Sequence, residues 1–219
     1  MRALWAEFIG TFLLVFAGTG AIIVNSASAG AVTQVGIALA FGLAVAIGIC
    51  GLAEFSGAHF NPAVTIGLAI AGRFAWARVP AYIVAECAGA VSASRLLRVL
   101  FPRDVTLGAT LPFAGVGIAF GFEVVMTFFL VFTIVSVARA ESPFTGLAPL
   151  AIGGAVALNA LFGGPISGAS MNPARSLGPA LVTGNWTAQW IYWTAPIAGA
   201  VIAAACFSLL RVPAKNEVP

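Results

Sequence analysis

The chain has 219 residues, of which 61% are hydrophobic and only 8% are charged, with a formal net charge of +3. A soluble domain has about 25% charged residues, so the composition excludes a cytosolic enzyme, a nucleic-acid-binding module and a disordered chain. It indicates an integral membrane protein whose basic residues mark the membrane faces.

The apolar runs of the chain are long enough for six membrane spans, because one span takes about 20 apolar residues. In chain order these runs are residues 4–24, 33–53, 79–100, 113–137, 145–163 and 187–210. Two shorter segments, 61–72 and 172–183, each begin at an Asn-Pro-Ala triplet. A helix of that length measures about 18 Å, which is too short for a hydrocarbon core of about 30 Å. Each short helix is therefore predicted to enter the membrane and to stop near its middle.

Similar residues occur in the same order in both halves of the chain. The matching markers are Glu7 with Glu123, residues 56–63 with 167–174, and Gly89 with Gly199. The members of each pair are separated by about 110 to 116 positions, which indicates a tandem duplication. Because each half holds an odd number of spans, the second half must enter the membrane from the opposite side.

We therefore predict an all-α membrane protein with six transmembrane helices and two re-entrant half-helices. Its single channel domain, residues 1–219, is expected to be an inverted repeat with halves 1–104 and 105–219. The two half-helices then come from opposite faces and meet at their N-termini.

The basic residues predict the orientation of the chain in the membrane. One predicted face carries six of them, namely Arg2, Arg73, Arg78, Arg139, Arg211 and Lys215. Arg95, Arg98 and Arg103 cluster at the opposite end of the third span. The majority on the first face predicts cytoplasmic termini, in a multi-pass protein of the cell (inner) membrane.

The two Asn-Pro-Ala triplets suit the start of a helix, since Asn is a favoured N-cap and Pro a favoured first residue. One triplet would indicate no more than that, whereas two at repeat-related positions indicate a shared site. The residues are Asn61, Pro62 and Ala63 in the first half and Asn172, Pro173 and Ala174 in the second. If the triplets meet, the positive ends of both helices oppose cations there, and both Asn amides can donate to a passing oxygen.

The segment before each short helix is rich in Gly and Ser and is predicted to be extended. Unpaired backbone at membrane depth is tolerated where it lines a water-filled cavity, so these segments can present a ladder of carbonyl groups. The predicted ladder comprises Gly57, Ala58, His59, Phe60, Gly168, Ser170 and Met171. Carbonyls facing apolar side chains would suit neutral solutes that carry hydroxyl groups. For His59, we favour a bracing or pore-lining contact over a metal site.

Three charged residues stand out within the predicted membrane segments. Arg175 follows the second triplet directly, and we interpret it as a pore constriction that repels cations, with pairing to a carboxylate as the alternative. Glu7 and Glu123 are repeat-related, so we interpret them as braces for the re-entrant loops rather than as a proton relay. Cys50, Cys87 and Cys206 lie in apolar runs without a metal-binding spacing, and we predict no metal, cofactor or catalytic site.

These residues together resemble the major intrinsic proteins, the aquaporins and aquaglyceroporins, over residues 4–210. The resemblance implies a pore within each protomer and a homotetramer. Residues 72–82 and 158–171 look like the plant nodulin-like branch and its bacterial relatives, which the resemblance links to glycerol, boric acid, silicic acid and arsenite. Glu54 and Glu86 depart from the family pattern, which usually has His and Gln there. The position of Glu54 suggests pH gating as a hypothesis.

The resemblance also implies a selectivity filter, formed by Phe41, Ala160, Ala169 and Arg175. Water-selective relatives usually have His where this chain has Ala160, so the constriction is expected to be wider and more apolar. We therefore predict a passive channel for water and small neutral solutes. The alternatives are a water-selective aquaporin with little solute flux and a proton-coupled transporter.

Overall fold

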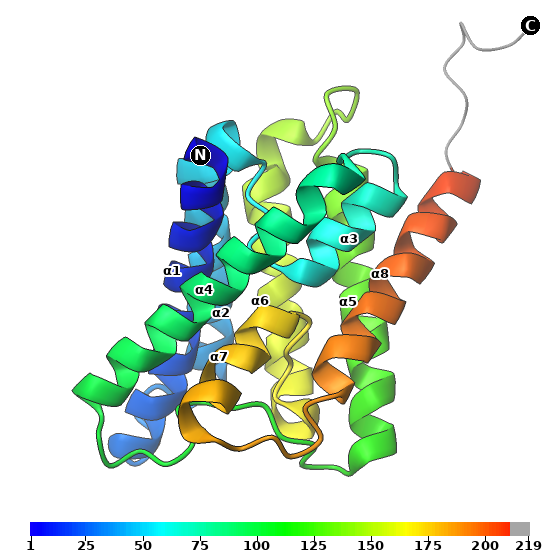
Figure 1. Cartoon of the computed structure of the whole chain (residues 1–219). Helices are drawn as coiled ribbons and strands as arrows, with labels where there is room; N and C mark the ends of the chain where they lie inside the picture. Colours follow the sequence, from blue (N-terminus) through cyan, green and yellow to red (C-terminus); the bar gives the residue numbers. More distant parts are fainter. Residues whose placement is uncertain (211–219) are drawn as a thin grey trace, which may run out of the picture.

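The computed structural model describes residues 1–210 (Figure 1), which form eight α-helices and two short 3-10 helices and contain no β-strand. The long helices are α1 (Arg2–Ala27), α2 (Thr33–Ser56), α4 (Val79–Leu100), α5 (Val116–Val137), α6 (Ala148–Ser167) and α8 (Ile191–Leu210). The short ones are α3 (Pro62–Ile70), α7 (Pro173–Thr183) and the 3-10 helices Trp76–Arg78 and Thr145–Leu147. The predicted fold class is confirmed, and each helix lies within a few residues of its predicted range.

Five of the long helices are long and apolar enough to cross a membrane, with α6 extended to Thr145–Ser167 by its preceding 3-10 turn. The sixth, α4, contains Glu86, Arg95 and Arg98 and is less apolar for that reason. Its 22 residues nevertheless span about 33 Å. We count α4 as the sixth span because both arginines lie near its C-terminal end, where long side chains can reach the membrane surface.

The outer surface of the helices is apolar. On α2, Leu39, Leu43 and Ile47 form a stripe at four-residue spacing, and their exposed fractions are 51%, 56% and 62%. Large apolar side chains in such a row are unfavourable in water but suit contact with lipid. The chain is therefore a multi-pass membrane protein.

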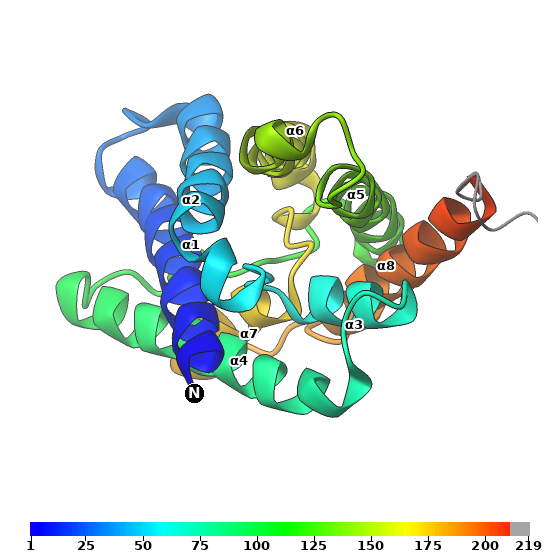
Figure 2. The ribbon, with the colours of Figure 1, turned by 90° about the horizontal axis from the view of Figure 1, so that it is seen from above.

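Each half of the chain contains one closely packed pair of long helices, and a third pair joins the two halves. Helix α1 packs along α4, α5 along α8, and α2 along α6. At the first two crossings a glycine allows the backbones to touch: a side chain on Gly89 would overlap the Phe8 carbonyl, and one on Gly199 the Val124 carbonyl. Seen from above (Figure 2), the long helices surround the segments that lead into α3 and α7.

Gly89→Ala is expected to destabilise the protein by about 1 to 3 kcal/mol, the usual cost of overpacking. The added methyl would meet backbone atoms of α1, which cannot move without separating the two helices. Gly51→Ala is the matched control, because nothing lies within 4 Å of that position and alanine favours the helix. Thermal unfolding in detergent checks both variants, and an equally stable Gly89→Ala protein would contradict the observed packing.

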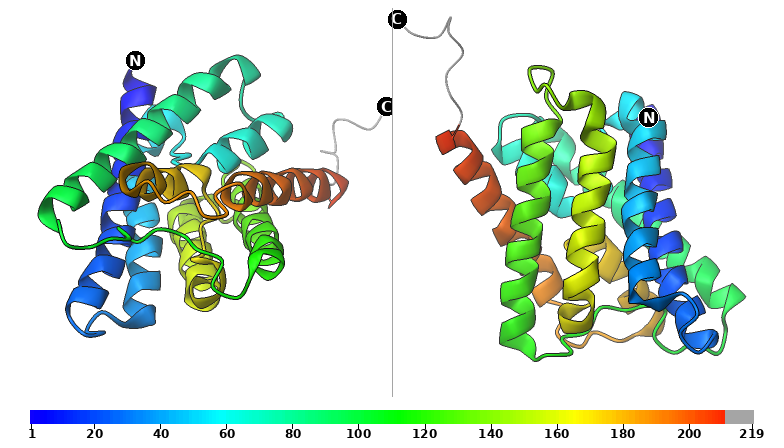
Figure 3. Two further views of the ribbon diagram at one scale, coloured as in Figure 1. Left: turned by 60° about the horizontal axis from the view of Figure 1, so that its bottom comes forward. Right: turned by 180° about the vertical axis from the view of Figure 1, so that it is seen from behind.

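The two short helices enter from opposite ends of the molecule and point toward each other (Figures 1 and 3). The Asn61 side chain caps α3 by accepting a hydrogen bond from Ala63 N at 2.9 Å. Asn172 caps α7 in the same way, accepting from Ala174 N at 3.0 Å and from Arg175 N at 3.2 Å. Their sequence, Asn followed by Pro, therefore starts both helices as predicted.

The starts of α1 and α4 and the ends of α3 and α5 lie toward the same end of the molecule (Figure 1). The basic residues next to these four positions are Arg2, Arg73, Arg78 and Arg139. Arg95 and Arg98 lie toward the opposite end of α4, and Arg103 follows in the next loop. Arg211 and Lys215, which the topology prediction also used, lie outside the described residues.

Candidate pore and its constriction

The two re-entrant loops are joined by a reciprocal pair of hydrogen bonds. Asn61 Nδ2 donates to the Met171 carbonyl at 2.7 Å, and Asn172 Nδ2 donates to the Phe60 carbonyl at 2.8 Å. A side-chain amide has two N–H groups, so each Asn keeps one for another acceptor. Both Asn residues line the central cavity described below. The structure thus brings the two triplets together, each helix start supporting the other.

Glu7 holds the first loop from α1. Its carboxylate is fully buried and accepts hydrogen bonds from His59 N at 3.0 Å and Phe60 N at 2.6 Å. These backbone groups would otherwise lack partners at membrane depth, which is costly.

Glu123 holds the second loop from α5 in the corresponding way. It is also fully buried and accepts from Ser170 N at 2.8 Å, Met171 N at 2.7 Å and Ser167 Oγ at 2.7 Å. Neither glutamate lines either of the two cavities described below. This location favours bracing over the proton relay, which needs a carboxylate that water can reach.

The loop backbone differs from the extended form that we predicted. Over residues 58–61 and 169–172, positive φ occurs at every second residue: Ala58 and Phe60 in the first loop have φ of 54° and 53°, and Ala169 and Met171 in the second have φ of 42° and 53°. Such left-handed conformations cost about 1 to 2 kcal/mol per residue outside glycine. The hydrogen bonds to Glu7 and Glu123 hold them in place, so the braces set the path of the loop carbonyls.

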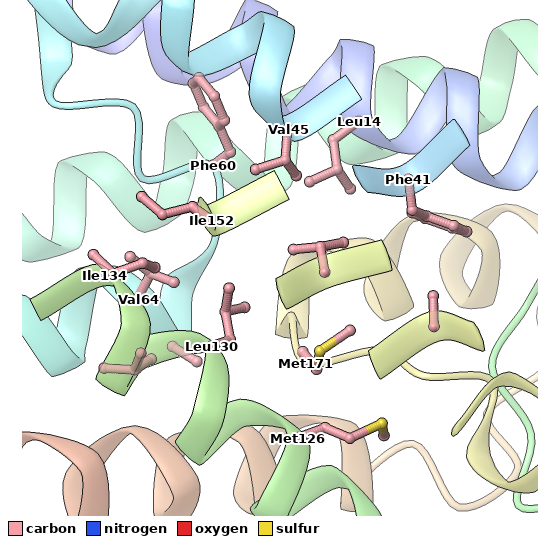
Figure 4. Packing of buried hydrophobic residues seen from close by; sticks show 14 of the residues in the cluster. Leu14, Phe41, Val45, Phe60, Val64, Met126, Leu130, Ile134, Ile152 and Met171 are labelled. Carbon is pink, nitrogen blue, oxygen red and sulfur yellow. The ribbon is translucent and has the colours of Figure 1, made fainter. Parts of the chain in front are cut away.

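A cavity of about 540 Å³ lies between the two loops on one side and α2, α5 and α6 on the other. The loops contribute six residues of the predicted carbonyl ladder, namely Gly57, Ala58, His59, Phe60, Ser170 and Met171. The helices contribute apolar side chains, among them Val45, Leu130 and Ile152 (Figure 4). One wall is therefore rich in hydrogen-bonding groups and the facing wall is apolar.

A second cavity of about 320 Å³ lies next to the first, toward the loop that connects α4 to α5. Gly168, the remaining residue of the predicted ladder, lines this second cavity instead of the first. The two cavities have four lining residues in common, and these are Phe41, Ala160, Ala169 and Arg175. The four residues implied as a filter thus come together from α2, α6, the second loop and α7 at the junction of the cavities.

Arg175 is 1% exposed and is held on two sides. Its Nη1 donates to the Gly108 carbonyl at 2.8 Å, and its guanidinium carbon lies 5.1 Å from the centre of the Phe41 ring. Its Nε and Nη2 have no hydrogen-bond partner among residues 1–210. Because buried donors normally have partners, these two groups make Arg175 a candidate hydrogen-bond donor at the junction. The hydrogen-bond partner of the Arg175 side chain is thus a backbone carbonyl, and not a carboxylate as in the alternative interpretation of this residue.

Two contacts at the junction were not predicted. Gly108 holds Arg175 from the loop between α4 and α5, and Gln34 Nε2 donates to the Ala160 carbonyl at 2.7 Å. The loop at 101–115 has no counterpart in the other half, so the repeat gave no signal for it. Glu54 is exposed on α2 and does not line either cavity.

Comparison with known proteins places these features in a family. The model of the family described as major intrinsic protein matches residues 1–207. Aquaporin NIP1-4 of Oryza sativa subsp. japonica is 48% identical over 213 residues, covering 97% of this chain and 78% of that protein. Nodulin-26 of Glycine max is 43% identical over 212 residues, covering 96% and 78%.

A solved structure is similar over nearly the whole chain. The X-ray structure of the aquaglyceroporin from Plasmodium falciparum matches with a TM-score of 0.83 and 28% sequence identity, covering 95% of this chain and 96% of that one. Sequence and fold thus agree over both halves of the molecule. The chain belongs to the major intrinsic protein family.

Proposed function

We propose that the protein is a passive channel for water and small neutral solutes, including glycerol and metalloid hydroxides such as boric acid, silicic acid or arsenite. The observation that carries the proposal is the junction of the two cavities, where the unpartnered donors of Arg175 share a ring with Phe41, Ala160 and Ala169. Glycerol has hydroxyl groups that can face the donors and a carbon backbone that can face the apolar side. A small side chain at Ala160 leaves room for it.

Ions and protons are excluded in this proposal by charge. The N-termini of α3 and α7 each carry about half a positive charge, and Arg175 adds a full one at the junction. A cation would meet these charges without a carboxylate to offset them, because the lining residues of both cavities include no Asp or Glu among residues 1–210. The names of the similar proteins, aquaporin and aquaglyceroporin, support a channel rather than an enzyme.

We further propose the arrangement that the sequence implied around this pore. The halves 1–104 and 105–219 act as inverted repeats, and the supporting observations are the matched helix pairs and the matched glutamate braces. The protein belongs to the nodulin-like branch with its bacterial relatives, forms a homotetramer, and lies in the cell (inner) membrane with cytoplasmic termini. The basic residues at the α1 end support that orientation.

Stopped-flow light scattering on proteoliposomes tests the function. We expect faster fluxes of water, glycerol and boric acid than in protein-free liposomes, with no increase in proton or potassium leak. Fast water flux without glycerol or boric acid flux would identify a water-selective channel and contradict the wide constriction. Accumulation of a solute against its gradient would identify a coupled transporter and contradict the channel itself.

A further inference from the structure

A buried chain of hydrogen bonds connects α4 to the first cavity. The Thr65 hydroxyl of α3 donates to Glu86 Oε1 at 2.6 Å, and the same hydroxyl oxygen lies 2.9 Å from His59 Nδ1. Glu86 and Thr65 are fully buried, and Glu86 Oε2 has no hydrogen-bond partner among the described residues. Of the three residues, His59 is the one that lines the cavity.

The direction of these bonds determines where the His59 proton lies. A hydroxyl group has one hydrogen, and when Glu86 Oε1 carries no proton, Thr65 uses that hydrogen toward Glu86. Its oxygen can then only accept at the second contact, so His59 Nδ1 must be the donor. In a neutral imidazole with a proton on Nδ1, the other nitrogen, Nε2, is a hydrogen-bond acceptor.

The Nε2 atom of His59 is the free ring nitrogen of a residue that lines the cavity. It has no hydrogen-bond partner in the described part of the chain, yet it is not among the enclosed polar atoms that lack one. The ring is held by aromatic contacts, with its centre 4.7 Å from that of Phe74 and 5.1 Å from that of Tyr82. These contacts limit rotation of the imidazole, so Nδ1 stays on Thr65 and Nε2 stays toward the lumen.

The second half of the molecule has the same contact without the carboxylate. Ser170 and Ser176 occupy the positions that correspond to His59 and Thr65, and their hydroxyl oxygens lie 2.6 Å apart. The outer partner there is the Thr110 hydroxyl, which donates to Ser176 at 2.8 Å. In this half the outer partner donates, whereas Glu86 in the first half accepts. The carboxylate therefore makes one side of the pore different from the other.

We propose that Glu86 is a positioning residue that, through Thr65, keeps the proton of His59 on Nδ1 and so presents Nε2 to the lumen as a hydrogen-bond acceptor. Nε2 then continues the row of loop carbonyls, which are acceptors too. A permeating hydroxyl group can donate to each of them in turn without reversing direction. This consequence for permeation rests on the proposed channel function, whereas the position of the proton does not.

Nitrogen-15 NMR of histidine-labelled protein in detergent measures the proton position directly. The chain has one histidine, so a preparation without a histidine tag gives the signals of His59 alone. We expect the wild type to carry the proton on Nδ1. Glu86→Met and Thr65→Val each remove a member of the chain and should raise the share of the Nε2–H form relative to Nδ1–H by about tenfold, as for the loss of a hydrogen bond to a charged group.

Two matched variants separate this effect from a general disturbance of the fold. Thr65→Ser keeps the hydroxyl and should keep the proton on Nδ1, and Glu54→Gln alters an exposed carboxylate of α2 and should leave the spectrum unchanged. A wild-type proton on Nε2, or on both nitrogens, would overturn the proposal. So would an unchanged tautomer in both Glu86→Met and Thr65→Val.

Glycerol flux through proteoliposomes tests the role of the acceptor in the lumen. Glu86→Met should lower glycerol permeability by about two- to tenfold, the usual range for one hydrogen bond. Thr65→Ser keeps the hydroxyl group and should have the glycerol permeability of the wild type. If Glu86→Met shifts the tautomer of His59 but leaves the glycerol flux unchanged, the proposed contact between Nε2 and permeating solutes is wrong. If the wild type carries no glycerol, the proposed function fails while the NMR result still decides the position of the proton.

Discussion

Glu123→Ala is expected to destabilise the protein by on the order of 5 kcal/mol, because it leaves three buried donors without an acceptor and each costs about 1 to 3 kcal/mol. Those donors are the backbone N–H groups of Ser170 and Met171 and the hydroxyl of Ser167. The loss is a large part of the total stability of a typical domain, which is about 5 to 15 kcal/mol. We therefore expect little folded protein after purification in detergent.

Three further variants make this prediction specific. Glu7→Ala removes the acceptor of two backbone donors and of the Ser56 side chain, which matches the loss in Glu123→Ala, and should be about as damaging. Glu123→Gln keeps one side-chain oxygen and should lie between Glu123→Ala and the wild type. Glu141→Ala removes an exposed carboxylate and should be neutral. Thermal midpoints from tryptophan fluorescence rank the four proteins, and a Glu123→Ala protein as stable as Glu141→Ala would contradict the bracing role.

Much of the fold could be predicted because its signals are local. The spans are long apolar runs, and the starts of α3 and α7 follow from Asn and Pro at the cap and first positions. The pairing of each glutamate with its loop followed from the repeat, since Glu7 and Glu123 have corresponding loops to hold. Helix α4 was found despite its charges because Arg95 and Arg98 lie near one end of its apolar run.

The parts of the site that could not be predicted depend on contacts between distant segments. The Gly108 carbonyl holds Arg175 across 67 positions of the chain, from a loop that has no counterpart in the repeat. The alternating left-handed residues Ala58 and Phe60 have no sequence signal of their own, because neither is a glycine. The four residues at the cavity junction were located by family resemblance, since their spacing alone does not define a ring.

Ala160→His is expected to lower glycerol permeability by about tenfold or more while water permeability falls by much less. Ala160 is 4% exposed and lines both cavities at their junction, so an imidazole there would occupy space that a permeating solute needs. Pocket contacts of this size change relative rates by about 10- to 200-fold. Water is smaller than glycerol and needs less of the space that the imidazole takes.

A smaller polar substitution separates bulk from polarity at this position. Ala160→Ser adds a hydroxyl group with little added volume and should keep glycerol permeability within about twofold of the wild type, corresponding to less than 0.5 kcal/mol. If Ala160→Ser lowers glycerol flux as strongly as Ala160→His does, the polarity of the ring and not its width controls passage.

The ratio of glycerol to water permeability, measured by stopped-flow light scattering on wild-type and Ala160→His proteoliposomes prepared together, tests the central claim most directly. The claim is that the ring of Phe41, Ala160, Ala169 and Arg175, where the two cavities meet, selects the solutes. We expect the ratio to fall by about tenfold in the variant, in line with the effect of pocket bulk on specificity. An unchanged ratio, whether both fluxes fall together or neither falls, would contradict the claim.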